Sequence, residues 1–435
     1  MLSAAYIYQI TNLIVGILMV PLLLRYLNVN EYVLWAVFTT LGGVTLQLEN
    51  AVQIVTVREI AREYYSGMTL AMRAALRKTK RAYNLLSLFV LTIVAGGGVY
   101  YLDVIAADKL EVTWGKEWVL FVCAYALNYF FGKNNSILLG TKNIAYFNYV
   151  NTFTRLLNLV LMYLLLNAGL SIFGLTISFA ISVVIGVAFI AYKAQVSIRK
   201  YYLSKNRAEN SFKQHDGSSK IFLYTMFTLA SFILYKSGLL IVTGLFSGNI
   251  IGSYALSLQI YTMLSAFALV PIQVWLSRLV RAIASSDPKS VIREMVMTVA
   301  VVNVIFVAGT VSLIALGDAL LFYIESKIAL LGKFDLAVMG FAFLIEVNIF
   351  VLVNFLVTTR NYDFVKLYLL TSFTGYLLGL IMVWMTMNIV LSLLVIPMLI
   401  QLVVCVPMIF RIVCRELNTT PKLLYTQIGM SFYRT

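Results

Sequence analysis

The sequence predicts an all-α polytopic membrane protein with about twelve transmembrane helices in two six-helix halves. Two numbers support this prediction: 61% of the 435 residues are hydrophobic and only 12% are charged. Soluble domains contain about 45–50% apolar and about 25% charged residues, so these values exclude a soluble enzyme. The apolar residues also fall in long blocks, which are best divided into membrane spans of about 20 residues each.

Twelve apolar stretches are long enough to cross the hydrocarbon core of a bilayer as helices. They cover residues 2–24, 32–55, 83–102, 118–138, 144–166, 170–192, 221–245, 250–275, 296–317, 336–358, 364–386 and 389–410. No basic segment precedes the first stretch, so we expect a retained helix and not a cleaved signal peptide.

The formal charge of +15 is unevenly divided between the two sides of the membrane. With both termini in the cytoplasm, and with Lys366 at the inner end of its span counted on that side, the cytoplasmic segments contain 25 of the 33 Lys and Arg residues and a net charge of +17. The outside loops then sum to −3 and the spans to +1. Since cytoplasmic loops are rich in Lys and Arg, this orientation is predicted. The positive charge therefore reports topology, and we expect no nucleic-acid partner.

A polar, basic linker divides the chain near its midpoint. We predict an N-terminal six-helix bundle at 1–192, a cytoplasmic linker at 193–220, a C-terminal six-helix bundle at 221–410 and a cytoplasmic tail at 411–435. In both halves a very short outside loop joins the first two spans, as expected for a transporter built by internal duplication. The basic connection at 57–82 predicts an amphipathic helical segment that faces lipid headgroups.

Few ionisable side chains lie inside the spans or at their ends. A charge at the centre of a span costs about 2.5–3.5 kcal/mol or more, so each of them needs a compensating role. Cations outnumber carboxylates in this set, which favours an anionic substrate. The set consists of Arg25, Glu49, Lys133, Arg155, Lys236 and Glu346.

Four polar residues of the fifth span share one helix face, namely Asn148, Asn151, Arg155 and Asn158. This face is either a polar seam between helices or part of a solvated pathway. We do not expect it to face lipid.

The remaining ionisable residues also have two interpretations each. Lys236 is a functional cation, or it snorkels or pairs with a carboxylate such as Glu346. Glu49, with Gln53 one turn later, is a coupling or gating site, or a helix-end carboxylate that contacts solvent. Arg25 is a functional cation or an interfacial residue, and Lys133 is best explained by snorkelling.

Several kinds of chemistry have no candidate residues in the sequence. His215 is the sole histidine, so the chain offers no ligand set for zinc and no histidine-based catalytic site. Gly140-Thr141-Lys142 lacks the remainder of a phosphate-binding loop. We therefore predict a protein that is not an enzyme and has no catalytic residue, metal site or cofactor.

The first helical hairpin carries a recognisable pattern. It reads Pro21-Leu22-Leu23-Leu24-Arg25-Tyr26-Leu27, then Glu31-Tyr32, Leu34-Trp35-Ala36 and Glu49. This pattern resembles the polysaccharide flippases, O-antigen transporter type, of the multidrug/oligosaccharidyl-lipid/polysaccharide superfamily. The chain departs from the family pattern at Asn28 and Val33, where glycines are usual, and at Glu49, where Asp is usual. Many relatives also have an Asp near Ser237, where this chain has Lys236.

The resemblance implies two six-helix bundles around a central cavity. It further implies alternating-access transport of an undecaprenyl-pyrophosphate-linked oligosaccharide, such as an O-antigen-like repeat unit of lipopolysaccharide or polysaccharide biosynthesis. Transport would run from the cytoplasmic to the periplasmic leaflet of the bacterial inner membrane. Expected partners are membrane lipids, and the polymerase and glycosyltransferases of the same pathway.

The candidate site residues fall into two groups. Substrate binding in the cavity, including binding of the pyrophosphate, is assigned to Arg25, Lys236, Arg155, Asn151 and Asn158. Coupling or gating is assigned to Glu49 and Glu346.

Two other functions remain as alternatives. The first is an ion-coupled exporter of drugs or other small molecules from the same superfamily, which would favour carboxylates over cations. The second is a membrane enzyme of glycan assembly, such as a polymerase, which the short outside loops disfavour.

Overall fold

The computed structural model describes residues 2–66, 69–105, 114–204, 218–246, 248–272, 275, 279, 288–359, 361–386 and 391–417. These residues form helices joined by short turns, and no strand occurs among them. The chain divides into two compact units. Unit 1 comprises Met1–Thr225, Leu239–Gly252 and Ile324–Ile328, and unit 2 comprises Met226–Gly238, Ser253–Tyr323 and Ala329–Thr435.

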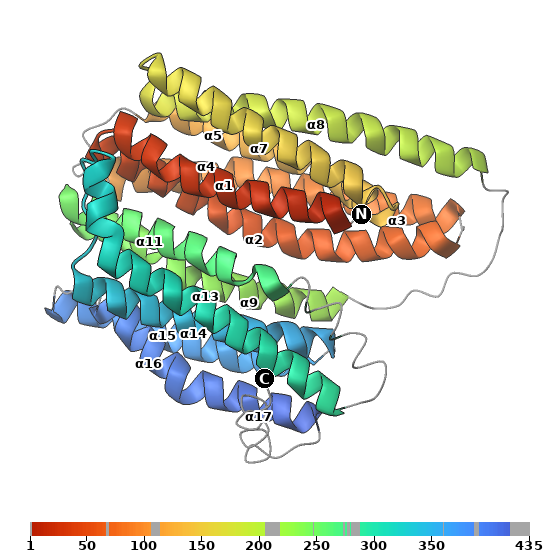
Figure 1. The fold of residues 1–435 in the computed structure, drawn as a ribbon. Coiled ribbons are helices and arrows are strands. Elements are labelled where there is room, and N and C mark those ends of the chain that lie inside the picture. The colour runs from red at the N-terminus through yellow and green to blue at the C-terminus, as the bar shows by residue number, and fades with distance from the viewer. Residues whose placement is uncertain are drawn as a thin grey trace. The chain divides into compact units, whose positions relative to one another are not determined.

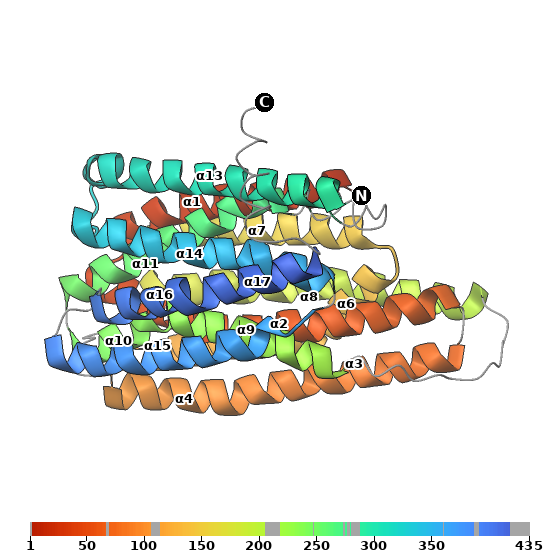
Figure 2. The same cartoon turned by 90° about the horizontal axis from the view of Figure 1, so that it is seen from below.

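Unit 1 is a bundle of long antiparallel helices. Its main elements are α1 (Leu2–Tyr26), α2 (Val29–Ser66), α3 (Thr69–Phe89), α4 (Ala95–Tyr100), α5 (Gly115–Phe131), α6 (Lys133–Gly140), α7 (Ile144–Asn167) and α8 (Ser171–Ser204). Helix α7 packs between α1 and α8, α5 packs against α3 and α8, and α2 packs against α3 and α6. Figure 1 shows α7 and α8 side by side, and Figure 2 shows the same for α2 and α3.

The basic connection between the second and third spans is helical, as predicted, but its apolar face is covered by protein. Helices α2 and α3 extend through it and leave only a short link between them. Ile60 and Met72 are fully buried in a cluster that includes Leu138, Ala194 and Tyr201. The arginines and lysines of α3 lie on its exposed face. This segment therefore extends the core of unit 1, and only its polar face is available to lipid headgroups.

Two glycines of unit 1 allow aromatic side chains to approach the backbone closely. A Cβ at Gly98, between two π-helical turns at Val90–Val94 and Tyr101–Ile105, would overlap the Trp118 ring. A Cβ at Gly132, where α5 gives way to α6, would overlap the Tyr83 ring. Contacts this short exclude any larger residue unless the ring moves.

Unit 2 contains α9 (Ser218–Lys236), α11 (Asn249–Ala268), α13 (Pro288–Tyr323), α14 (Lys333–Thr358), α15 (Phe364–Thr386), α16 (Ile396–Ile400) and α17 (Val406–Glu416), although the first turns of α9 and α11 belong to unit 1. Helix α14 packs against α13 and α17. Rings of Tyr235, Tyr261 and Phe343 connect α9, α11 and α14. Fully buried aromatic residues on these helices form the core of the unit.

The last predicted span is irregular because of its two prolines. A π-helical turn at Leu391–Val395 precedes Pro397, and a second at Gln401–Cys405 precedes Pro407. Each proline lacks an N–H group, and its ring collides with the carbonyl four residues earlier, at Leu393 or Val403. The wider turn relieves this collision, so the two prolines explain where the helix departs from α geometry.

Each of the twelve predicted spans falls largely on helical segments, and the chain is a polytopic membrane protein by fold. Ten helical segments of the described chain are long and apolar enough to cross a bilayer. The two predicted spans that are not among these ten are 32–55 and 118–138, and the composition of one and the length of the other explain this. Helix α2 carries Glu49, Gln53 and other polar residues, and α5 has only 17 residues before the interruption at Gly132.

Helix α10 (Gly238–Leu245) and the start of α11 group with unit 1, although they follow the predicted linker. The Tyr101 hydroxyl donates to the Leu240 carbonyl oxygen, and Gly252 lies against Val29. The division into bundles at 1–192 and 221–410 therefore stays a prediction about the chain's organisation. The compact units follow spatial contacts, and unit 1 includes two short segments of the second half, Leu239–Gly252 and Ile324–Ile328.

Candidate functional site

The predicted site residues lie in both units. Unit 1 contains Arg25, Glu49, Asn151, Arg155 and Asn158, and unit 2 contains Lys236 and Glu346. Each unit thus holds one intramembrane carboxylate and at least one candidate cation.

Glu49 lies on α2, and only 7% of its surface is exposed. The side chain of Asn135, on α6, is its hydrogen-bonding neighbour. The phenols of Tyr83 and Tyr129, from α3 and α5, are close enough to interact electrostatically with its carboxylate. Four helices therefore converge on one buried acidic group.

A network of hydroxyl groups surrounds this carboxylate. Thr45 lies on α2, one turn before Glu49. Its Oγ1 is 2.7 Å from the Tyr129 hydroxyl. Ser136 Oγ lies 2.8 Å from Thr56 Oγ1 and 3.0 Å from the Tyr83 hydroxyl. We define the Glu49 cluster as Glu49, Thr45, Thr56, Tyr83, Tyr129, Asn135 and Ser136. Its members can accept or donate protons, or supply oxygen ligands to a small cation.

The polar face of α7 includes buried, partly buried and exposed side chains. Asn148 is buried, Asn151 and Asn158 are partly buried, and Arg155 is exposed. The Asn158 side-chain oxygen is buried without a hydrogen-bond partner. Arg155 interacts electrostatically with Tyr125 of α5, and Tyr125 also interacts electrostatically with Glu49. The structure therefore connects Arg155 with Glu49 through one tyrosine.

Arg25 lies in the last turn of α1 with an exposed side chain. Its guanidinium carbon is 6.0 Å from the centroid of the Tyr26 ring. A cation at the C-terminal end of a helix also complements the helix dipole. No described contact joins Arg25 to Glu49 or Arg155.

The hairpin pattern that carries the family resemblance is largely structural. Asn28 and Glu31 cap the start of α2 reciprocally, with two backbone-to-side-chain hydrogen bonds of 2.9 Å each. This arrangement is a capping box with asparagine in the first position. Tyr32 and Leu34 are fully buried behind the cap. Apart from the exposed Arg25, the pattern specifies a tight turn between two helices.

Unit 2 places Lys236 and Glu346 near each other. Lys236 lies in the last turn of α9 and is partly buried, and Glu346 lies on α14. The ammonium group acts electrostatically on the carboxylate, which also accepts a hydrogen bond of 3.0 Å from Ser231 Oγ. Their charged atoms form no ion pair within the 4.0 Å that defines the salt bridges of the described chain. The structure thus places Lys236 within electrostatic range of Glu346 without a direct ion pair, and both interpretations of Lys236 stay predictions.

Several residues of this second site did not stand out in the sequence. Tyr235 and Tyr368 both interact electrostatically with Glu346, and the Tyr235 hydroxyl is buried without a hydrogen-bond partner. Ser237 donates a hydrogen bond of 2.8 Å to the Tyr376 hydroxyl. We define the Glu346 cluster as Glu346, Lys236, Ser231, Tyr235 and Tyr368. Tyrosines are frequent in apolar spans, so only their distance from the carboxylate distinguishes these two.

Among the described residues, no group of three or more His, Cys, Asp or Glu side chains could hold a metal ion. The two clusters are therefore single-carboxylate sites. They suit protonation, or binding of a weakly held monovalent cation or a charged substrate group.

No protein-family model matches the sequence. No curated protein matches it. Solved structures, however, share the fold. A multidrug resistance MATE family transporter of the MOP superfamily, in an inward-facing conformation, matches with a TM-score of 0.66 and 12% identity, over 95% of this chain and 96% of that chain.

Two further structures have different descriptions. The lipid II flippase MurJ, in an inward closed conformation, matches with a TM-score of 0.62 and 13% identity, over 98% of this chain and 89% of that chain. A MOP superfamily transporter from Pyrococcus furiosus, described as having a binding pocket of reverse polarity, matches at 0.58 and 12% identity, over 96% of both chains. The chain therefore has the fold of MOP superfamily transporters, a group that includes both drug exporters and a lipid flippase.

Proposed function

We propose that this protein is a flippase for an undecaprenyl-pyrophosphate-linked oligosaccharide in the bacterial inner membrane. It would move the substrate from the cytoplasmic to the periplasmic leaflet by alternating access, and the repeat unit would resemble an O-antigen. The resemblance of the first hairpin to polysaccharide flippases supports this proposal. So does the fold, which is shared with a lipid II flippase.

The observation that carries the proposal is the intramembrane cation Lys236 beside Glu346. A pyrophosphate is a concentrated anion, and a fixed cation in a low-dielectric site attracts it strongly. When Glu346 gains a proton, Lys236 loses its compensating charge and becomes available to the anion. Proton uptake at Glu346 and substrate binding at Lys236 are then coupled.

Unit 1 supplies the other half of the proposed mechanism. Arg25 and Arg155 are exposed cations, and Asn151 and Asn158 line the same face of α7 as Arg155. We assign these four residues to binding of the pyrophosphate and the first sugars. Glu49, within its cluster, is assigned to ion coupling or gating.

The proposed orientation has both termini in the cytoplasm, since this places +17 of charge on that side. Membrane lipids and the polymerase and glycosyltransferases of the same pathway are the proposed partners.

The test is surface glycan production in cells that depend on this protein. Lys236→Gln should lower surface glycan at least about tenfold, because a charge-assisted hydrogen bond is worth about 1.5–3 kcal/mol and 1.4 kcal/mol is about tenfold in rate. Lys133→Gln is the matched control, as it removes a partly buried lysine that lies over the Phe130 ring. Normal glycan in the Arg25→Gln/Lys236→Gln double variant, at wild-type membrane levels, would refute the assignment.

An ion-coupled exporter of cationic drugs is a second candidate, because each unit contains an intramembrane carboxylate. Under that function, Glu49→Gln and Glu346→Gln would abolish drug resistance conferred on a sensitive strain. Lys236→Gln would leave resistance intact or increase it. The two functions thus predict opposite effects of the same lysine substitution.

A further inference from the structure

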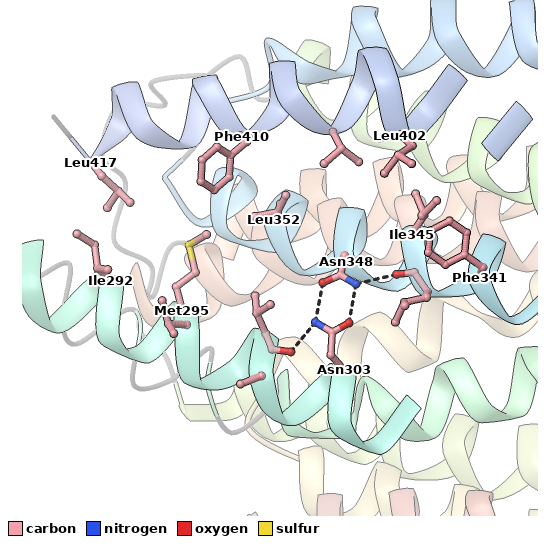
Figure 3. A pocket seen from close by; sticks show the side chains of 15 residues that line it. Ile292, Met295, Asn303, Phe341, Ile345, Asn348, Leu352, Leu402, Phe410 and Leu417 are labelled. Carbon is pink, nitrogen blue, oxygen red and sulfur yellow. Dashed lines mark hydrogen bonds between the residues drawn. The ribbon is translucent and has the colours of Figure 1, made fainter. Parts of the chain in front are cut away.

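Unit 2 contains an apolar pocket that neither cluster uses. Its volume is about 520 Å³, and its lining comes from α13, α14 and the last helical segment. Figure 3 shows Ile292 and Leu417 at one end and Phe341 and Leu402 at the other, with Asn303 and Asn348 between them. All these helices are long and apolar enough to cross a membrane, so the pocket lies at the depth of the bilayer.

The two asparagines do not make this pocket a polar site. Each Nδ2 donates to the other side chain's Oδ1, at 2.9 and 2.8 Å. The second N–H of each amide donates to a carbonyl of its own helix, at Val299 or Leu344, and both distances are 2.8 Å. All four N–H groups are therefore satisfied without water. An apolar cavity with satisfied polar groups stays dry and favours an apolar occupant.

The dimensions of the pocket fit one hydrocarbon chain. From Ile292 to Asn303 the lining of α13 extends about 16 Å at 1.5 Å per residue, close to half of the roughly 30 Å hydrocarbon core. At the roughly 30 Å³ that a water molecule occupies in the liquid, the volume of about 520 Å³ corresponds to about 17 groups of that size, and a methylene group is of similar size. An acyl chain of a membrane phospholipid has this size. An undecaprenyl chain has 55 carbons and is several times too large.

The charges at one end of the pocket indicate the headgroup. Arg293 follows the lining residue Ile292, and Arg411 follows the lining residue Phe410, and both side chains are exposed. Arg415 adds a third exposed cation on α17. Two carboxylates lie nearby in sequence, Glu294 and Glu416, and Glu416 accepts a hydrogen bond from Asn361. The balance is positive, which favours an anionic headgroup.

We infer that this pocket binds one acyl chain of an anionic phospholipid, with the phosphate beside Arg293 and Arg411. Two lining residues, Phe341 and Leu402, are 46% and 37% exposed, so the rim is open and the chain can enter sideways. In the proposed topology the headgroup lies in the cytoplasmic leaflet. The inference does not depend on which substrate the protein transports.

Photocrosslinking in vesicles tests this inference. The purified full chain is reconstituted in phosphatidylethanolamine with phosphatidylglycerol that carries a diazirine at a chosen acyl carbon. In the wild type, diazirines near the headgroup should label peptides around Arg293 and Arg411, and diazirines near the chain end should label peptides around Asn303 and Phe341. Uniform labelling of all lipid-facing helices, with no order in depth, would overturn the inference.

A pair of variants on one helix provides the control. Ala300→Phe fills the pocket, while Val304→Phe places the same side chain on a residue that is 68% exposed. Labelling of the pocket peptides should fall at least about fivefold in the first variant and stay at the wild-type level in the second. Equal labelling in both would contradict the inference, and the depth order in the wild type remains a test if Ala300→Phe does not fold.

Competition identifies the source of the chain. Unlabelled phosphatidylglycerol should displace the label, and phosphatidylcholine should do so less well. Arg293→Gln/Arg411→Gln should remove this preference. Displacement by undecaprenyl phosphate at lower concentration than by phosphatidylglycerol would show that the pocket serves a carrier lipid, and would overturn the assignment to a phospholipid.

Discussion

The Glu49 cluster of unit 1 and the Glu346 cluster of unit 2 place one carboxylate each inside the membrane, but they compensate its charge differently. Glu49 has a neutral surrounding of one amide and several hydroxyl groups. Glu346 has one serine hydrogen bond and a lysine within electrostatic range. Because the groups around Glu49 are neutral, its carboxylate can bind a proton or a cation without breaking an ion pair. When Glu346 is protonated, an anionic group of the substrate can compensate the charge of Lys236 in its place. The Glu346 cluster therefore suits an anionic substrate.

The largest expected effect comes from breaking the charge balance in unit 2. Lys236→Met leaves Glu346 with only the Ser231 bond, and Glu346→Gln leaves Lys236 without a compensating charge. Each single variant should lose about 2.5–3.5 kcal/mol of stability, since an uncompensated charge in a span is this costly. Thermal unfolding in detergent would measure the loss.

The double variant Lys236→Met/Glu346→Gln sharpens this result. It should recover most of the stability but none of the transport, because both charges are then absent. Additive destabilisation in the double variant would show that the two residues do not compensate each other.

The next effect concerns coupling in unit 1. Glu49→Gln retains the volume of the side chain and its hydrogen bond with Asn135, so the fold should be preserved. Transport should slow at least about tenfold, equivalent to 1.4 kcal/mol in the barrier, and lose its response to an imposed ion gradient. Flipping assays in vesicles with and without a gradient would measure both. An unchanged rate under a gradient would exclude Glu49 from coupling.

A steric substitution tests whether the Glu49 cluster requires its exact packing. Gly132→Ala forces the Tyr83 ring away from the α5–α6 junction, and overpacking of this kind costs about 1–3 kcal/mol. The melting temperature should fall by several degrees. Gly96→Ala is the control, because a Cβ at Gly96 has no neighbour within 4 Å. Equal melting temperatures for both variants would show that Tyr83 moves without cost.

The smallest expected effect is the loss of one hydroxyl. Thr45→Val removes the partner of the Tyr129 hydroxyl and should cost about 1 kcal/mol. Ser237→Ala is the matching change in unit 2, where it removes the bond to Tyr376. Chemical unfolding of the two variants compares the hydroxyl networks directly. A much larger loss for Ser237→Ala would show that the second unit depends more on its polar contacts.

The sequence predicted features that depend on local chemistry. Long apolar stretches specified the spans, which fall on helical segments in the structure. The nearness of Lys236 to Glu346 agrees with the expectation that a charged residue inside a span needs compensation, although no direct ion pair joins them. These predictions depend on the free-energy cost of placing charged or polar groups in the membrane, and this cost can be estimated from the residue types alone.

Other features depend on tertiary packing and could not be predicted. Asn135 and Tyr129 approach Glu49 from opposite sides of Gly132, where α5 gives way to α6, and nothing in the span pattern shows this interruption. The grouping of α10 with unit 1 depends on contacts such as Tyr101 with Leu240. The lipid-facing prediction for 57–82 missed the burial of Ile60 and Met72, because an amphipathic pattern does not reveal what covers its apolar face.

The most direct test of the proposed function is flipping of a fluorescent polyprenyl-pyrophosphate-linked oligosaccharide in vesicles that contain the purified protein. We expect wild-type protein to move the lipid across the bilayer, Lys236→Arg to retain most of this activity, and Lys236→Gln to lose it at least about tenfold. Equal flipping by wild-type and Lys236→Gln protein, or no flipping above protein-free vesicles with any variant, would contradict the account.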